Sequence, residues 1–164
     1  MAQGAKSKST LQVRMATAAD MAAMISLVNT AFEVESFLEG TRTDAQRMSE
    51  MMQKGQFLVG AQDGNMVASV YVEVRGDRAY LGMLAVDPSR QGSGVGRLMG
   101  DAVEAYCREQ GCKYLDLTVL SLRSELLPFY RKLGFVETGT EEFHPPFGIK
   151  DGLECHKIVM TKPL

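Results

Sequence analysis

The chain has 164 residues, 45% of them apolar, which is enough for one domain with a sizeable core. Its formal net charge is -2 and both signs are mixed along the chain, so charge gives no reason to expect nucleic acid or an anionic membrane as a partner. The three cysteines lack CxxC spacing and the two histidines are scattered, which argues against disulfides or a metal site and fits a reducing, cytoplasmic location.

The first residues, Met1–Thr10, are polar and contain Lys6 and Lys8, without the apolar core of a signal peptide. No apolar run approaches the ~20 residues that a membrane-spanning helix needs. We therefore expect residues 1–10 to be a flexible leader and residues 11–164 to form a single domain.

A short first strand is predicted at Leu11–Met15. Thr17 and Asp20 then resemble a capping box, with aspartate in place of the usual glutamate. Apolar residues at helical spacing follow as far as Phe32, which predicts a helix behind this cap.

The next segment, 33–42, is less periodic and is expected to be a loop or a broken helix. Thr43 with Gln46 forms a second capping box, which predicts the start of a short helix. This helix would place three methionines on one face: Met48, Met51 and Met52.

A three-stranded meander is predicted next, with strands at 56–61, 66–74 and 79–86. Asp63-Gly64 is a hairpin signal between the first two strands, and Arg75-Gly76-Asp77 is a turn before the third. Pro88 ends the third strand because proline cannot donate a hydrogen bond to the ladder.

A long amphipathic helix is predicted from Gly94, with Gly111 placed to end it in a left-handed conformation. Its apolar positions would be Val95, Leu98, Met99, Ala102, Tyr106 and Cys107. A strand at 114–120, a helix at 125–133 and closing strands at 135–138 and 154–160 complete the prediction, with an irregular segment at 141–152. This order predicts a mixed α/β (α+β) domain in which helices flank one central sheet.

The strongest chemical feature is the glycine-rich stretch 86–97, where an apolar strand ends and the long helix begins. The unpaired amides of a helix start point outward, and glycines let phosphate oxygens approach the backbone closely. Arg90 and Arg97 would add charge-assisted hydrogen bonds. The GxGxxG spacing of dinucleotide-binding folds fails, because Met99 or Arg97 stands at the third glycine, and Gly-Lys-Ser/Thr is absent. A plain tight turn is the alternative interpretation.

Two motifs in this chain resemble those of the GNAT superfamily of N-acetyltransferases. Gln91, Gly94 and Gly96 match its Gln/Arg-x-x-Gly-x-Gly/Ala signature, after a segment, 84–88, that looks like the exit of its fourth strand. Some forty residues later, 129–135 resembles the second hallmark of the family, a tyrosine in a short helix closed by Gly-Phe. The resemblance covers nearly the whole chain after the leader.

The resemblance implies a mostly antiparallel sheet whose fourth and fifth strands splay apart to hold acetyl-CoA, with no metal. The strand backbone at Leu84, Ala85 and Val86 would pair with the pantetheine amides. The turn would hold the pyrophosphate through Gln91, Gly92, Ser93, Gly94, Val95, Gly96 and Arg97. Arg123 stands where many relatives have an asparagine that contacts the cofactor.

The resemblance also implies that Tyr130 is the general acid that protonates the departing CoA thiolate, although a core aromatic is the alternative. The amine would attack the thioester directly, with a backbone amide near Leu84 stabilising the oxyanion. Many relatives carry a glutamate base on the fourth or fifth strand, and this chain has none there. The candidates for the base are therefore Glu35, Glu73, Tyr80, Asp116 and His144.

In this fold the segment after the first helix, 33–42, walls the acceptor side. Glu35 would attract an ammonium group and Arg42 would hold a carboxylate, which favours a small, amino-acid-like amine over a long basic peptide. A solvated loop is the alternative interpretation. Two other functions stay open: a protein N-terminal or lysine acetyltransferase, and a CoA-binding sensor without turnover. A homodimer also stays open.

Overall fold

The computed structural model of the protein describes residues 10–145, 148–150 and 152–164. The leader predicted at residues 1–10 therefore lies outside these ranges, except for Thr10. The strands are β1 Gln12–Met15, β2 Gln56–Gln62, β3 Asn65–Arg75, β4 Arg78–Val86, β5 Tyr114–Leu120, β6 Val136–Glu142 and β7 His156–Pro163. The helices are α1 Met21–Ala31, α2 Ala45–Lys54, α3 Val95–Glu109 and α4 Leu127–Lys132, with short 3-10 turns η1 Ala18–Asp20, η2 Pro88–Arg90 and η3 Ser121–Leu126.

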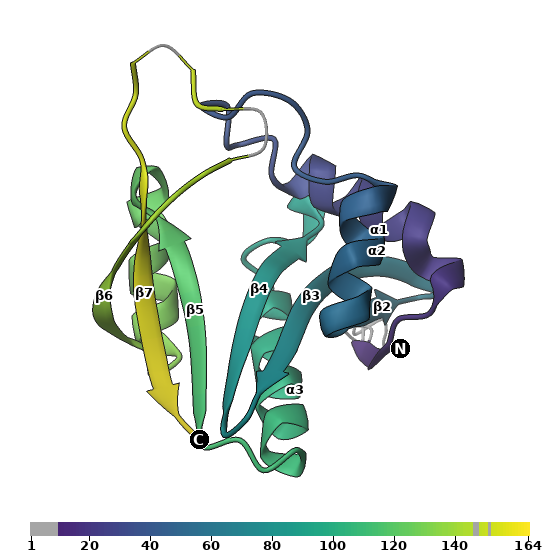
Figure 1. Ribbon diagram of the computed structural model, residues 1–164. Helices are drawn as coiled ribbons and strands as arrows, with labels where there is room; N and C mark the ends of the chain where they lie inside the picture. Colours follow the sequence, from purple (N-terminus) through teal and green to yellow (C-terminus); the bar gives the residue numbers. More distant parts are fainter. Residues whose placement is uncertain (1–9, 146–147, 151) are drawn as a thin grey trace, which may run out of the picture.

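The seven strands form one sheet in the order β1-β2-β3-β4-β5-β7-β6 (Figure 1). Neighbouring strands run antiparallel except β4 and β5, which run parallel. Helices α1 and α2 cover one face of the β2–β4 half, and α3 lies behind the other face (Figure 1). The prediction of a mixed, mostly antiparallel sheet flanked by helices is confirmed.

Two apolar cores hold the helices to the sheet. Met24 of α1 and Met48 of α2 pack with Phe57 and Tyr71 on one face. On the other face, α3 and α4 pack against the sheet in the larger cluster. Within the described ranges, no helix combines the length and apolar character that crossing a membrane would need.

The buried stripe of α3 differs from the predicted one. The buried residues are Val95, Met99, Val103 and Cys107, four positions apart along α3. Residues at this spacing lie on the same face of a helix, and this face packs against the sheet. Leu98 was expected in this stripe, but it is 48% exposed, so that part of the prediction is wrong.

The sheet splits between β4 and β5. These strands pair at only three positions, of which Tyr80 opposite Asp116 is the last, and beyond it neither strand bonds to the other. Figure 1 shows the gap widening from that point. At the base of the split, Arg78 donates two hydrogen bonds of 2.8 and 2.7 Å to the Asp116 carboxylate, and the Thr161 hydroxyl donates a third of 2.6 Å.

Most of the turns and helix caps predicted from the sequence are present in the structure. Asp63 and Gly64 both have left-handed backbones, with φ of 53° and 77°, as the predicted two-residue hairpin requires. The capping box of Thr17 and Asp20 is present at η1. The second predicted box is wrong, because Asp44 caps α2 by accepting a 2.9 Å hydrogen bond from the Arg47 amide.

The C-terminal elements are longer or later than predicted. The closing strands extend to Glu142 and Pro163. Apolar periodicity could not predict where they end, because β6 is exposed along its whole length and its partner β7 is only half buried. The predicted helix at 125–133 is α4, entered through the 3-10 turn η3, with Pro128 in its first turn.

Candidate active site

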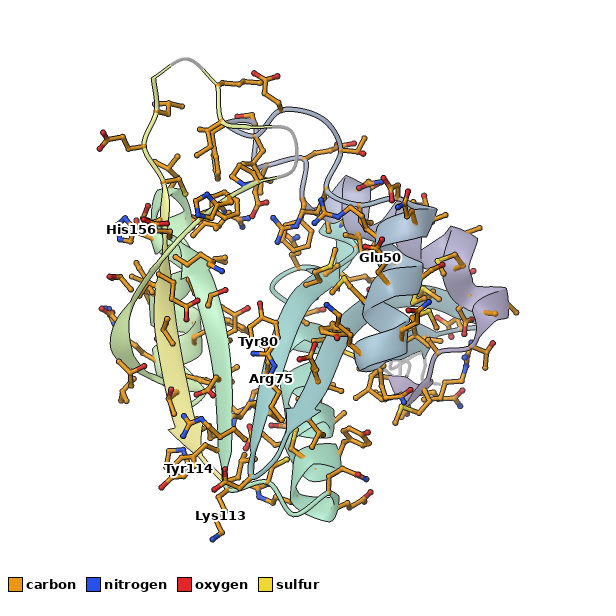
Figure 2. All side chains as sticks on the ribbon, viewed as in Figure 1. Glu50, Arg75, Tyr80, Lys113, Tyr114 and His156 are labelled. Carbon is orange, nitrogen blue, oxygen red and sulfur yellow. The ribbon has the colours of Figure 1, made fainter. Side chains whose placement is uncertain are left out.

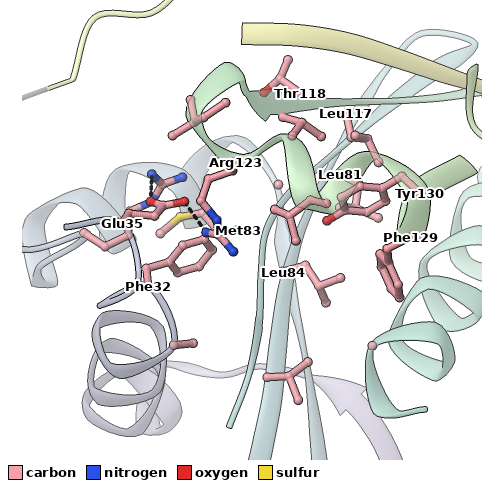
Figure 3. A pocket seen from close by; sticks show the side chains of 18 of the residues that line it. Phe32, Glu35, Leu81, Met83, Leu84, Leu117, Thr118, Arg123, Phe129 and Tyr130 are labelled. Carbon is pink, nitrogen blue, oxygen red and sulfur yellow. Dashed lines mark hydrogen bonds and ion pairs between the residues drawn. The ribbon is translucent and has the colours of Figure 1, made fainter. Parts of the chain in front are cut away.

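A cavity of about 730 Å³ occupies the split between β4 and β5. Its walls come from parts of the chain that are far apart in sequence: β4, the glycine-rich turn before α3, β5 and the η3–α4 segment, with further residues from the end of α1, the loop after it, and β6 and β7 (Figure 3). The splayed strands therefore form a continuous recess, in which backbone edges that no neighbouring strand occupies are available to a ligand.

The glycine-rich turn closes one end of this cavity. Gly92 and Gly94 have left-handed φ values of 81° and 87°, and a Cβ atom placed on either would meet nothing within 4 Å. Gly94 is the N-cap of α3, so the first amides of that helix have no partner within it. The turn therefore offers an open, partly positive backbone surface suited to an anion.

The predicted turn residues do not all reach the cavity. Gln91, Gly92, Gly94, Gly96 and Arg97 line it, and so does Arg90. The Ser93 hydroxyl instead donates to the backbone carbonyl of Arg90, and Val95 is buried in the core. Gly96 is also a packing position, because a Cβ atom there would come within 3.3 Å of the Phe129 ring.

The β4 wall contains a β-bulge. Tyr71 pairs with Gly82 and Ser69 with Ala85, so Met83 and Leu84 together stand opposite Val70 alone. Met83 has a left-handed φ of 49°, which is strained for a bulky residue. Leu84 and Val86 line the cavity, whereas Ala85 is buried on the α1 side. A bulge leaves backbone groups out of the ladder next to the cavity.

Tyr130 lies on α4 and lines the cavity with its side chain 9% exposed. Its ring makes edge contacts with Phe129 and Phe135. Burial raises the pKa of its hydroxyl to about 12, and that hydroxyl has no hydrogen-bond partner among the described residues. Figure 3 shows the hydroxyl directed toward β4. Tyr130 is thus packed like a core residue but keeps an unpaired proton donor at the cavity wall.

Glu35 is held between two arginines at the opposite end of the cavity. Its carboxylate accepts hydrogen bonds of 3.0 Å from Arg42 and 2.8 Å from Arg123 (Figure 3). The Glu35 side chain is 4% exposed, and Arg123 also pairs with Glu125 at 2.8 Å. Both predicted acceptor residues and Arg123 therefore meet in one ion-pair cluster, which joins the α1–α2 loop to η3 across 88 positions of sequence.

The candidates for the base separate by position. Tyr80, His144 and Glu35 line the cavity. Glu73 instead accepts hydrogen bonds from Tyr71 and Arg75, and Asp116 lies in the ion pair at the base of the split, so hydrogen bonding lowers the pKa of both carboxyls. Tyr80 packs under the Arg75 guanidinium, 4.9 Å from the ring centre (Figure 2). Thr118 of β5 lines the cavity without an acidic group.

A second, smaller recess of about 240 Å³ adjoins this end of the cavity. We call it the side pocket. The α1–α2 loop, α2 and the segment after β6 form its walls, and Glu35, Arg42, Tyr80 and Met83 line both spaces. Sequence reasoning missed Arg47, which lines the side pocket one helical turn before Met51 on α2. Their four-residue spacing was the available signal.

A backbone strap borders the side pocket, which Leu38 and Glu39 of this strap line. Leu38 forms an isolated antiparallel bridge with Ile149, the Glu39 amide donates to the Gly148 carbonyl at 3.1 Å, and the Lys150 amide donates to the Phe37 carbonyl at 2.9 Å. The strap is therefore residues 37–39 paired with 148–150. It links the two loops that wall this end of the site.

The family model, the similar sequences and the similar structures all point to acetyltransferases. The model of the acetyltransferase (GNAT) domain matches residues 25–152. The [ribosomal protein bS18]-alanine N-acetyltransferase of Escherichia coli is 31% identical over 103 residues, 63% of this chain and 68% of that protein. Mycothiol acetyltransferase of Propionibacterium freudenreichii is 32% identical over 88 residues, which span 54% of this chain but only 25% of that protein.

Solved structures share the fold across almost the whole chain. The crystal structure of the ribosomal-protein-S18-alanine N-acetyltransferase from E. coli has a TM-score of 0.76 at 22% identity and covers 94% of both chains. The structure of yncA, a putative acetyltransferase from Salmonella typhimurium with its cofactor acetyl-CoA, has a TM-score of 0.73 at 21% identity and covers 95% of both.

Proposed function

The chain belongs to the GNAT acetyltransferase family, and we propose that it transfers an acetyl group from acetyl-CoA to the amine of a small molecule by direct attack. Family membership makes it an acetyl-CoA-dependent N-acetyltransferase. One observation carries the assignment of the site. The cavity between β4 and β5 has a glycine turn with open backbone amides at one end, and in its wall a tyrosine hydroxyl without a partner among the described residues.

The cavity suits the elongated donor. Its phosphates would lie on the open backbone at Gly92–Gly96, where Arg90 and Arg97 supply positive charge. The pantetheine arm would lie between the unpaired edges of β4 and β5, next to the bulge at Met83–Leu84. Arg123 is already paired with Glu35 and Glu125, so we assign it to holding the acceptor end in place more than to the cofactor.

Acetyl-CoA supplies a thioester. The residues of this chain would position the thioester, donate a proton to the leaving sulfur and accept a proton from the amine. The amine nitrogen bonds to the carbonyl carbon, the carbon–sulfur bond breaks, and Tyr130 gives its proton to the sulfur. A backbone amide at the Met83–Leu84 bulge would stabilise the oxyanion. The amine must lose a proton, and Tyr80 or His144 would receive it directly or through water, because these residues line the cavity without an ion pair to an arginine.

The strap supports a small acceptor. Residues 37–39 and 148–150 are hydrogen-bonded to each other, and Leu38 and Glu39 line the side pocket, so a long peptide leaving the pocket on this side would have to pass them. The competing acceptor is a protein N-terminus, which the relative acting on ribosomal protein bS18 favours.

Release of CoA thiol, measured with acetyl-CoA and a panel of amines, tests this function. We expect release with small amines and none with hexapeptides, and Tyr130→Phe should slow it without weakening acetyl-CoA binding. Release only with peptides would replace the small-molecule acceptor by a protein N-terminus. Binding of acetyl-CoA without release for any amine would refute the proposed transfer.

A further inference from the structure

One arginine of the side pocket has a side chain without a partner among the described residues. Arg47 lines the pocket from α2, yet its guanidinium forms no ion pair or hydrogen bond with any residue that the structure describes. Its backbone amide donates to the Asp44 carboxylate that caps the helix. Arg47 is half-buried, and a guanidinium in that setting normally has a carboxylate or carbonyl partner.

The buried carboxylate of the pocket is already paired with two other arginines. Glu35 uses one oxygen for Arg42 and the other for Arg123, so its negative charge is balanced without Arg47. Arg42 uses one of its nitrogens for Glu35 and stacks on the Phe32 ring, 4.7 Å from its centre. Glu39 also lines the pocket, but it is exposed and forms no ion pair with Arg42 or Arg47 among the described residues, so both arginines keep guanidinium N–H donors that a ligand carboxylate could use.

The other walls of the side pocket combine apolar and polar side chains. The apolar side chains are Phe32, Leu38, Met51, Met83 and Phe143, and the polar ones are Glu39, Thr41, Tyr80 and His144. The volume of about 240 Å³ suits a ligand of roughly the size of an amino acid, and Leu38 and Glu39 of the strap line one wall. Because the side pocket and the main cavity share Glu35, Arg42, Tyr80 and Met83, a ligand anchored in the pocket can extend its other end toward the thioester site.

We infer that the acceptor is a free amino acid with an apolar side chain, whose carboxylate binds Arg47 and Arg42 in the side pocket while its amino group reaches the main cavity. This inference rests on the proposed acyl transfer. It assigns Arg47 as the residue that selects for the carboxylate. A peptide lacks this carboxylate beside its terminal amine, so it would leave Arg47 unpaired and would meet the strap.

The test compares matched acceptors in the CoA-release assay: L-phenylalanine, L-phenylalaninamide, 2-phenylethylamine and L-phenylalanyl-glycine, with the same series built on methionine and leucine. We expect at least one free amino acid to have a kcat/KM about tenfold or more above its three analogues, as a charge-assisted hydrogen bond lost from a half-buried site implies. The amide has the less basic amine, so amine basicity cannot produce a preference for the acid.

Arg47→Gln should lower kcat/KM for that amino acid about tenfold, through KM, and leave kcat/KM for its amide unchanged, while Arg47→Lys should restore part of the loss. Lys113→Gln removes the same charge at the far end of the molecule and should change neither value (Figure 2). Melting temperatures of the variants, measured in the presence of CoA with and without the amino acid, report binding apart from turnover.

Equal or better use of the amides or dipeptides would overturn the inference, and so would an equal loss for acid and amide in Arg47→Gln. If CoA is released only with amines outside this series, such as polyamines or longer peptides, the inference is wrong while acyl transfer stands. If acetyl-CoA binds but no amine releases CoA, the proposed function itself fails.

Discussion

The Tyr130 hydroxyl is buried and has no hydrogen-bond partner among the described residues, so it is protonated and its O–H is available to hydrogen-bond to a thiolate. Its pKa of about 12 keeps it protonated throughout the physiological range. Tyr130→Phe keeps the ring contacts with Phe129 and Phe135 and removes only the hydroxyl. Steady-state kinetics should show turnover falling by ~10²–10⁴-fold, the usual contribution of general acid catalysis.

The acetyl-CoA affinity of Tyr130→Phe should stay close to that of the wild type, because the aromatic packing is retained. Unchanged turnover, with chemistry shown to be rate-limiting, would assign Tyr130 to packing alone.

Glu35 forms ion pairs with two arginines from different parts of the chain, so its charge should contribute to the stability of the fold as well as to acceptor binding. Glu35→Gln should destabilise the protein by about 1.5–3 kcal/mol, because charge-assisted hydrogen bonds to a buried carboxylate are lost. The Michaelis constant for the amine should rise while that for acetyl-CoA changes little. Thermal unfolding and steady-state kinetics measure the two effects.

Glu125→Gln is the matched control, because Glu125 also pairs with Arg123 but is 63% exposed. It should cost little stability. Equal effects of the two substitutions would mean that the buried cluster has no special role.

At the level of single elements, the turn between β4 and α3 depends on backbone freedom. Gly94→Glu places a bulky anion where a phosphate would lie, and should weaken acetyl-CoA binding by at least about tenfold in calorimetric titration. The cost to folding should be only about 1–2 kcal/mol, because Gly94 has open space around it and the penalty is the left-handed backbone alone.

Gly111→Glu is a control with the same constraint. Gly111 has a φ of 81° and equally open surroundings, but it follows α3 at the far end. Unaltered acetyl-CoA binding in Gly94→Glu would remove the turn from the donor site.

The base of the split depends on Asp116, which joins β4 to β5 and β7 through Arg78 and Thr161. Asp116→Asn should cost about 1 kcal/mol near neutral pH, a modest value because the pair is partly exposed. For a chain of this size that corresponds to a fall in melting temperature of about 2–4 °C. Asp101→Asn on the exposed face of α3 should have no such effect.

This stabilisation should depend on pH. The hydrogen bonds from Arg78 hold the pKa of Asp116 below its unfolded value of about 3.9, so the pair stabilises the fold above that pH and the effect is lost as pH falls through the lower, folded pKa. The difference in melting temperature between wild type and Asp116→Asn should be constant from about pH 5 to 8 and shrink below about pH 4. A difference that grows in acid would contradict this role.

At the level of the whole molecule, the sheet consists of two halves, β1–β4 and β5–β7, which are hydrogen-bonded to each other at one end of β4 and β5 and separate at the other end. Much of this follows from local sequence signals: the strand at 114–120, the hairpin at Asp63-Gly64 and the glycine N-cap at Gly94 each depend on a few neighbouring residues. The second capping box fails because two adjacent residues, Thr43 and Asp44, are both good caps, and the buried position of Thr43 decides between them.

Long-range features could not be predicted in this way. The bulge at Met83 depends on a register shift against β3, and the pairing of Glu35 with Arg123 joins positions 88 residues apart. The role of Arg47 depends on which carboxylates the folded chain has already used. Residue types and spacing predict most of the cavity lining at the glycine turn, because backbone geometry governs it. They predict the acceptor end poorly, because side chains brought together by folding govern it.

Hydrogen–deuterium exchange of the wild-type protein, with and without acetyl-CoA, tests the central claim most directly. A donor bound between β4 and β5 should slow exchange in the segments 81–86, 90–97 and 117–120, while β1, β2 and the end of α3 stay unchanged. Protection confined to these segments is the result that we predict. No protection at millimolar acetyl-CoA, or protection mainly outside the split, would contradict the assignment of this cavity as the acetyl-CoA site.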